Sequence, residues 1–231
     1  RDVTAQEKLD TVMLELDGTP NQSKLGANSI LAVSIAAIKA ASSTYNLPLF
    51  HYLQKRYRPG SNLRIPTPIF NLINGGAHGA GNLDFQEFHV IPSSRMPYKE
   101  ALRAGAEIWM SLRDELIHRN AIHSVGDEGG FAPDLFTNAD ALELMSVVIK
   151  NSPYRLGLDV FLGLDVAANG FHKSGVYHIK DSPKPLDRDG MTQLYLSLVK
   201  DYGLLSLEDP LDHDDWKGWT ELTRVIPEST M

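Results

Sequence analysis

The chain has 231 residues, of which 42% are hydrophobic and 22% are charged, and its formal net charge is −7. This composition is typical of a soluble globular protein with one large or two smaller domains. The acidic balance, with no basic run longer than Lys55-Arg56, argues against nucleic-acid binding. The absence of cysteine excludes disulfides and thiolate metal sites. The longest apolar stretch, residues 30–38, is far shorter than the roughly 20 residues that span a bilayer, so no membrane partner is expected.

The first part of the chain is expected to be mainly helical. Helices are predicted at residues 8–16, at residues 28–42 and from Pro48 onward. The run Asp17-Gly18-Thr19-Pro20-Asn21 has the chemistry of a turn between the first two. The second helix is apolar on almost every side, so we expect it to be buried.

A turn-rich run, Arg58-Pro59-Gly60-Ser61-Asn62, predicts a boundary between a domain of residues 1–62 and a domain of residues 63–231. Beyond it, short apolar strands alternate with amphipathic helices, which indicates an α/β fold of βα units around a parallel sheet. Strands are expected at residues 69–73, 85–91, 160–166 and 204–207, and helices at residues 98–119, 139–150, 191–202 and 214–225.

A glycine-rich loop follows the first of these strands, in Gly75-Gly76-Ala77-His78-Gly79-Ala80-Gly81-Asn82. Its glycines allow backbone or ligand to approach closely. His78 could contact an anion or transfer a proton. By pattern alone, a flexible turn with an exposed histidine is the simpler interpretation.

Two glutamates, Glu87 and Glu128, stand in unusual surroundings. Period-two alternation gives Glu87 the same strand face as Phe85 and His89, and a carboxylate among apolar neighbours must be paired, protonated or solvated. A solvent-facing glutamate on a half-buried strand explains Glu87 more simply. Glu128 lies in Val125-Gly126-Asp127-Glu128-Gly129-Gly130-Phe131-Ala132-Pro133, a loop that could present a carboxylate at a cleft. An acidic surface turn explains that loop equally well.

Asp165 and Glu208 each end an apolar strand, which in a β/α barrel is the end that carries the chemistry. Burial of either carboxylate would be costly without a cation. Oxygen ligands in a chain without cysteine suit Mg²⁺, which takes one or two carboxylates together with waters and substrate oxygens. Capping of the following helices is the alternative. Because both acids occupy the same structural place, a metal site is the favoured interpretation.

Taken together, these segments resemble enolase, also called phosphopyruvate hydratase. The matching motifs occur in the family's order, at compatible spacing, over most of the chain. They are Leu16-Asp17-Gly18-Thr19, Leu25-Gly26-Ala27-Asn28-Ser29-Ile30-Leu31, Asn74-Gly75-Gly76-Ala77-His78, Gln86-Glu87-Phe88, Gly126-Asp127-Glu128-Gly129-Gly130-Phe131-Ala132-Pro133, Leu164-Asp165-Val166-Ala167-Ala168 and Leu207-Glu208-Asp209-Pro210.

The resemblance implies the helical part of an N-terminal α+β domain, followed by part of a TIM-like β/α barrel of the ββαα(βα)6 type. It also implies a glycolytic lyase, a cytoplasmic homodimer that reversibly dehydrates 2-phosphoglycerate to phosphoenolpyruvate. By position, Asp165 and Glu208 match ligands of the catalytic Mg²⁺. Glu128 matches the general acid that helps hydroxide depart. Glu87 matches its carboxylate neighbour at the substrate, and His78 matches a substrate-contacting loop histidine.

The resemblance covers roughly the middle half of the family's length. The family's catalytic lysine, its third carboxylate ligand and a second substrate-binding lysine would follow Met231, and its mobile serine loop would precede Arg1. About four strands are expected here, whereas a closed barrel of this kind needs eight. We therefore expect these residues to be a fragment of a longer gene product that is inactive by itself.

Two other interpretations remain open. One is a non-catalytic binding or scaffolding protein derived from an enolase, and the other is a different superfamily member acting on another carboxylate. Retention of all five matched site residues favours the enzyme, since a protein without activity has no physical reason to keep them. The loop of residues 126–133 and the His78 loop favour enolase over other members.

Overall fold

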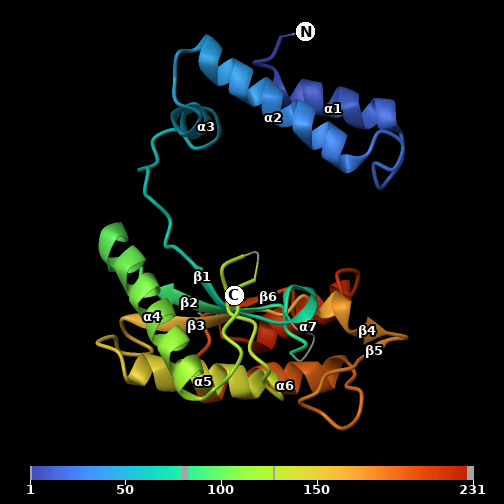
Figure 1. The fold of residues 1–231 in the computed structure, drawn as a ribbon. Helices are drawn as coiled ribbons and strands as arrows, with labels where there is room; N and C mark the ends of the chain where they lie inside the picture. The colour runs from blue at the N-terminus through green and yellow to red at the C-terminus, as the bar shows by residue number, and fades with distance from the viewer. Residues whose placement is uncertain (1, 80–82, 127, 228–231) are drawn as a thin grey trace. The chain divides into compact units, whose positions relative to one another are not determined.

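The computed structural model describes residues 2–79, 83–126 and 128–227 (Figure 1). It divides into two compact units, Arg1–Ile65 and Pro66–Met231. The division lies close to the turn-rich run at residues 58–62. Each unit has its own helices and its own buried side chains, and the second unit alone contains the sheet.

The first unit consists of α1 (Gln6–Asp17), α2 (Ala27–Thr44) and α3 (Leu49–Tyr57). Helix α2 packs against both of the others. Helix α2, which we expected to be buried, is covered only in part by α1 and α3, and within this unit Leu31, Val33 and Ile35 are 57%, 51% and 41% exposed.

No single helix among the described residues is long and apolar enough to cross a membrane. Helices α2 and α3 pass that test only when taken together, and the chain bends by 95° between them.

The turn between α1 and α2 is organised around the buried carboxylate of Asp17. Its oxygens accept hydrogen bonds from the backbone N–H groups of Thr19 (3.1 Å), Lys24 (3.1 Å) and Leu25 (2.6 Å), and from the Thr19 hydroxyl. Gly18 follows in the left-handed region, with φ of 67°, and ends the helix. The bonds from Leu25 and Thr19 lower the pKa of Asp17 below its ordinary value.

The second unit is built on a four-stranded sheet in the order β1 (Phe70–Asn74), β2 (Glu87–Pro92), β3 (Val160–Asp165) and β6 (Ser206–Glu208). The expected parallel sheet was only partly right, because β1–β2 and β2–β3 are antiparallel and only β3–β6 is parallel. The described connection between β1 and β2 holds only the short turn η1 (Gly76–His78), so the chain returns directly and antiparallel. Two helices between β2 and β3 also return the chain antiparallel, whereas a single helical crossover makes β3 and β6 parallel.

One face of the sheet is covered by helices α4 (Tyr98–His118), α5 (Asn138–Lys150), α6 (Arg188–Tyr202) and α7 (Trp216–Val225). Helix α4 packs against β1 and β2, and α5 lies beside α6 below the sheet (Figure 1). Strand residues such as Phe88, Val90 and Leu164 are fully buried against these helices. Burial of each such side chain stabilises the fold by about 1.5–3 kcal/mol, so this face holds the core.

Short elements complete the loops. The hairpin of β4 (His172–Lys173) and β5 (Val176–Tyr177), which the sequence pattern did not predict, follows the single turn η2 (Ala168–Gly170). Thr137 closes a capping box with Asp140 at the start of α5. Asp187 caps α6 and Asp215 caps α7 through backbone N–H groups.

Candidate active site on the polar face of the sheet

Three carboxylates lie in one row across the sheet. Glu87 at the start of β2 is the partner of Asp165 at the end of β3, and Asp165 is the partner of Glu208 at the end of β6. Residues directly opposite one another in a sheet point to the same face, on strands about 4.8 Å apart. Residues far apart in the sequence thus form one feature, the carboxylate row of Glu87, Asp165 and Glu208.

Asp165 lies at the centre of the row and is only 9% exposed. Its two oxygens accept hydrogen bonds from the Gln86 amide (3.1 Å) and the Ala167 N–H group (3.1 Å). Burial raises the pKa of Asp165, and the negative charge of Glu208 raises it further. A cation between Asp165 and Glu208 would relieve both effects.

The donor atoms of these two residues fit Mg²⁺, because carboxylate oxygens on adjacent strands are the ligands that this ion prefers. The described residues hold no group of three or more histidine, aspartate or glutamate side chains arranged for a metal. Mg²⁺ usually keeps several waters and takes one or two carboxylates, so a two-carboxylate set suits it better than an ion that needs an all-protein cage.

A histidine on the next position of the same face holds Glu87. His89 Nε2 lies 2.8 Å from Glu87 Oε2, and the His89 residue is 5% exposed. Burial lowers the pKa of His89, while the charges of Asp165 and Glu208 oppose that effect. The expectation that Phe85 shares this face was wrong, since β2 begins only at Glu87 and the Phe85 ring stacks on Phe88 in the core.

Two asparagines of β1 continue the polar face because the strand contains a bulge. Asn71 is the partner of His89 and Asn74 is the partner of Glu87, with a register shift between Asn71 and Ile73. Strict alternation would send residues three apart to opposite faces. Both amides are buried, and neither makes a hydrogen bond to any residue that the structure describes. Unsatisfied amides on this face are typical of a surface that takes a polar partner.

The loop that carries Glu128 is tied to β1. The Asn74 N–H group donates to the Phe131 carbonyl (2.7 Å), and the Phe131 N–H group donates to the Leu72 carbonyl (2.8 Å). A Cβ atom at Gly130 would lie 2.8 Å from the Asn71 amide oxygen, so only glycine lets the loop approach this closely. The structure thus places Glu128 beside β1, next to the strand that begins with Glu87.

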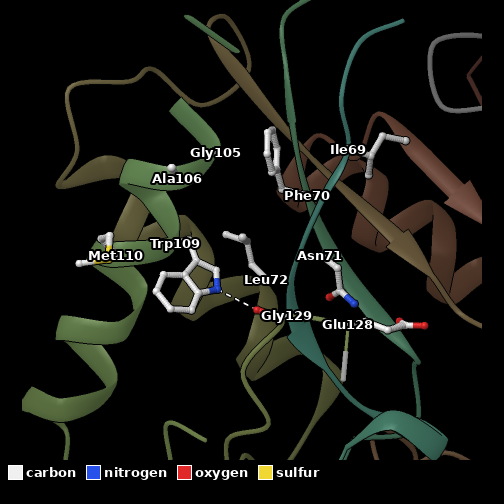
Figure 2. A pocket seen from close by; sticks show the side chains of 10 residues that line it. All are labelled: Ile69, Phe70, Asn71, Leu72, Gly105, Ala106, Trp109, Met110, Glu128 and Gly129. Carbon is white, nitrogen blue, oxygen red and sulfur yellow. Dashed lines mark hydrogen bonds between the residues drawn. The ribbon is translucent and has the colours of Figure 1, made fainter. Parts of the chain in front are cut away.

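Helix α4 also contacts the loop that carries Glu128, through Trp109. The Trp109 indole N–H group donates to the Gly129 carbonyl (2.8 Å), and the indole stacks on Phe131 at 4.6 Å (Figure 2). In Figure 2 the Glu128 side chain extends away from the Trp109 ring. A pocket of about 470 Å³ lies here, with apolar walls from β1 and α4. Glu87, Asp165 and Glu208 do not line this pocket, so the apolar pocket beside β1 and the carboxylate row are different features.

The remaining predicted residue is only partly described. The backbone of His78 ends η1, and its side chain lies outside the described residues, as does Asp127 next to Glu128. The structure therefore joins Glu87, Asp165 and Glu208 in one row and sets Glu128 beside β1. No role was predicted for Gln86, Asn71 or Asn74, and the β1 bulge that aligns the two asparagines has no sequence pattern that would reveal it.

Comparison with protein-family models matches both units. A model described as the enolase N-terminal domain covers residues 1–53, and one described as the enolase C-terminal TIM barrel domain covers residues 62–230. The mixed α/β second unit agrees with part of that barrel. The second match covers more than half of the residues, so the chain belongs to the enolase family.

Proposed function

We propose that this chain comes from a lyase that reversibly dehydrates 2-phosphoglycerate to phosphoenolpyruvate with Mg²⁺. Family membership supports the reaction class, and the alignment of Asp165 with Glu208 on adjacent parallel strands is the observation that carries the proposal. A buried, centrally placed carboxylate beside a second one is suited to a dication and an anionic substrate. A cytoplasmic location and a homodimer are further proposals that rest on family membership alone.

Asp165 and Glu208 would hold the metal, and bound Mg²⁺ would stabilise the negative charge that develops on the substrate carboxylate. The chain is acidic and the substrate is an anion, so these two side chains would otherwise repel it. The Gln86 amide and the Ala167 N–H group fix the orientation of Asp165, which keeps its oxygens directed along the row.

Glu128 and Glu87 would carry the proton chemistry at the leaving hydroxyl. Glu128, as the acid, donates a proton so that hydroxide departs as water, and Glu87 is its carboxylate neighbour. His78 would contact the substrate from the loop after β1.

A further residue must act as the base that removes the substrate proton. The four strands of the sheet, all within the described residues, carry no lysine or arginine. We therefore expect these 231 residues to bind Mg²⁺ and substrate without turning the substrate over. Measurable turnover of 2-phosphoglycerate by the purified chain would contradict this expectation.

Calorimetric titration with Mg²⁺ tests the metal site. We expect saturable binding by the wild-type chain and an affinity at least about tenfold lower in Asp165→Asn and Glu208→Gln, because each change removes a charged ligand. Asp114→Asn, an exposed aspartate of α4, is the matched control and should bind as the wild type does. Equal affinities in all four proteins would show that the row is not the metal site.

Binding of phosphoenolpyruvate separates the enzyme from the scaffold alternative. We expect binding that requires Mg²⁺ and is lost in Asp165→Asn. A chain that binds Mg²⁺ but shows no metal-dependent affinity for either phosphorylated acid would favour a non-catalytic protein.

A further inference from the structure

His89 occupies a buried position on the polar face that the proposed chemistry does not use. Its row across the sheet consists of Asn71 on β1, Gly163 on β3 and Ser206 on β6. This row lies next to the carboxylate row, and within it His89 is 5% exposed. An ionisable ring buried among apolar strands needs a partner to offset its desolvation.

Glu87 is that partner, and the geometry identifies the donor. His89 Nε2 lies 2.8 Å from Glu87 Oε2, whereas the other ring nitrogen, Nδ1, is buried and has no hydrogen-bond partner among the described residues. A carboxylate only accepts hydrogen bonds, so the proton must be on Nε2. The neutral ring with its proton on Nε2 satisfies Glu87 and leaves Nδ1 as a bare acceptor.

On the strand beside β2, a glycine packs closely against its neighbours. Gly163 lies opposite His89, and a Cβ atom there would meet Ile91 Cδ1 at 2.8 Å and His89 Cβ at 3.5 Å. It would also collide with the Ser206 hydroxyl. A side chain at position 163 would therefore displace the Ser206 hydroxyl and the end of the Ile91 side chain, whereas its distance to His89 is an ordinary van der Waals contact.

We propose that His89 is a positioning residue for Glu87, which it holds in the carboxylate row through an Nε2–H···Oε2 hydrogen bond. The catalytic consequence rests on the proposed function. A glutamate has three rotatable bonds, and fixing one of its oxygens also fixes the direction of the other, toward Asp165 or toward the substrate. His89 does not itself touch the reacting atoms.

Nitrogen NMR of the imidazole tests the hydrogen bond independently of any ligand. We expect a neutral ring at pH 7 with its proton on Nε2, and with slow exchange of that proton with solvent. In Glu87→Ala we expect the imidazole ring to keep its position and its Nε2 proton to exchange rapidly with solvent. A proton on Nδ1 in the wild type, or unchanged exchange in Glu87→Ala, would overturn the proposal.

Two His89 variants test positioning. His89→Met keeps similar volume and removes the donor, and His89→Gln places an amide N–H group near the former Nε2. With Mg²⁺ present, we expect His89→Met to bind phosphoenolpyruvate about tenfold more weakly and His89→Gln to recover most of the affinity. Melting temperatures of both variants show whether the fold is kept.

The results separate this proposal from the proposed function. A wild-type chain that binds no phosphorylated acid would overturn the proposed function, while the NMR measurement still decides whether His89 holds Glu87. Wild-type affinity in His89→Met, together with weak binding in Glu87→Ala, would overturn the positioning role.

Discussion

Asp17 shows how one carboxylate can organise a turn. Its oxygens collect hydrogen bonds from three backbone N–H groups and one hydroxyl, and Asn at this position would lose the charge and one acceptor. We expect Asp17→Asn to speed amide exchange in residues 18–26, measured by mass spectrometry. Glu15→Gln, an exposed neighbour on α1, is the control and should exchange as the wild type does. Equal exchange in both variants would contradict the role of Asp17.

The same residue predicts a pH dependence. The pKa of Asp17 is lower in the folded chain than its ordinary value, so the stabilising bonds are fully present at neutral pH. They are lost as the pH falls below about 4, where the unfolded chain takes up a proton first. Exchange of residues 18–26 should rise over this range in the wild type, and Asp17→Asn should lack that component of the rise. An identical pH profile in the variant would refute the assignment.

Trp109 connects the Glu128 loop to α4. Trp109→Phe keeps a ring to stack on Phe131 and removes the donor to the Gly129 carbonyl. We expect a loss of about 1 kcal/mol in the free energy of unfolding and faster exchange of the loop amides, measured by urea denaturation and hydrogen exchange. Trp216→Phe is the control, because Trp216 is 77% exposed. A loop that exchanges equally slowly in both variants would show that Trp109 does not anchor it.

At the scale of elements, Asn138 joins the start of α5 to the segment that leads into β2. Its side-chain oxygen accepts from the N–H groups of Asp84 (3.1 Å) and Phe85 (3.0 Å), and its own N–H group donates to Asp181 (3.0 Å). Asn138→Ala would leave the buried Phe85 N–H group without a partner, at a cost of about 1–3 kcal/mol. Urea denaturation should detect this loss, with Asn151→Ala, an exposed position after α5, as the control. An unchanged midpoint in Asn138→Ala would contradict this account.

The helices of the second unit could largely be predicted from the sequence, whereas the strand directions and the β1 bulge of its sheet could not. Apolar spacing predicted α4 at residues 98–119, and the structure has it at Tyr98–His118, because one face of this helix meets the core. The alternation of strands with helices along the chain predicted a parallel sheet. Whether two neighbouring strands are parallel or antiparallel depends on the connection that leads from one to the other. The β1 bulge also escaped prediction, although it brings Asn71 and Asn74 to the same face as Glu87.

At the scale of the whole molecule, residues 58–69 join the last helix of the first unit to the first strand of the second. No helix or strand lies between α3 and β1, and residues 59–67 are exposed. We expect trypsin under native conditions to cut first after Arg64, since Arg58 is followed by proline and Arg56 lies in α3. The fragments, identified by mass spectrometry, should correspond to the two units. Arg64→Gln should slow this cut, and first cleavage within α4 or α6 would contradict the division.

The sequence by itself determined the family, the turn at Asp17 and the candidate carboxylates, because each depends on a local run of residues. Only the tertiary structure decided that Glu87, Asp165 and Glu208 share one row, that His89 contacts Glu87, and that α1 and α3 leave one side of α2 uncovered. The physical reason is that strand register and the covering of a helix are set by contacts between distant segments. A period of two or 3.6 specifies a face of an element and does not specify what lies against it.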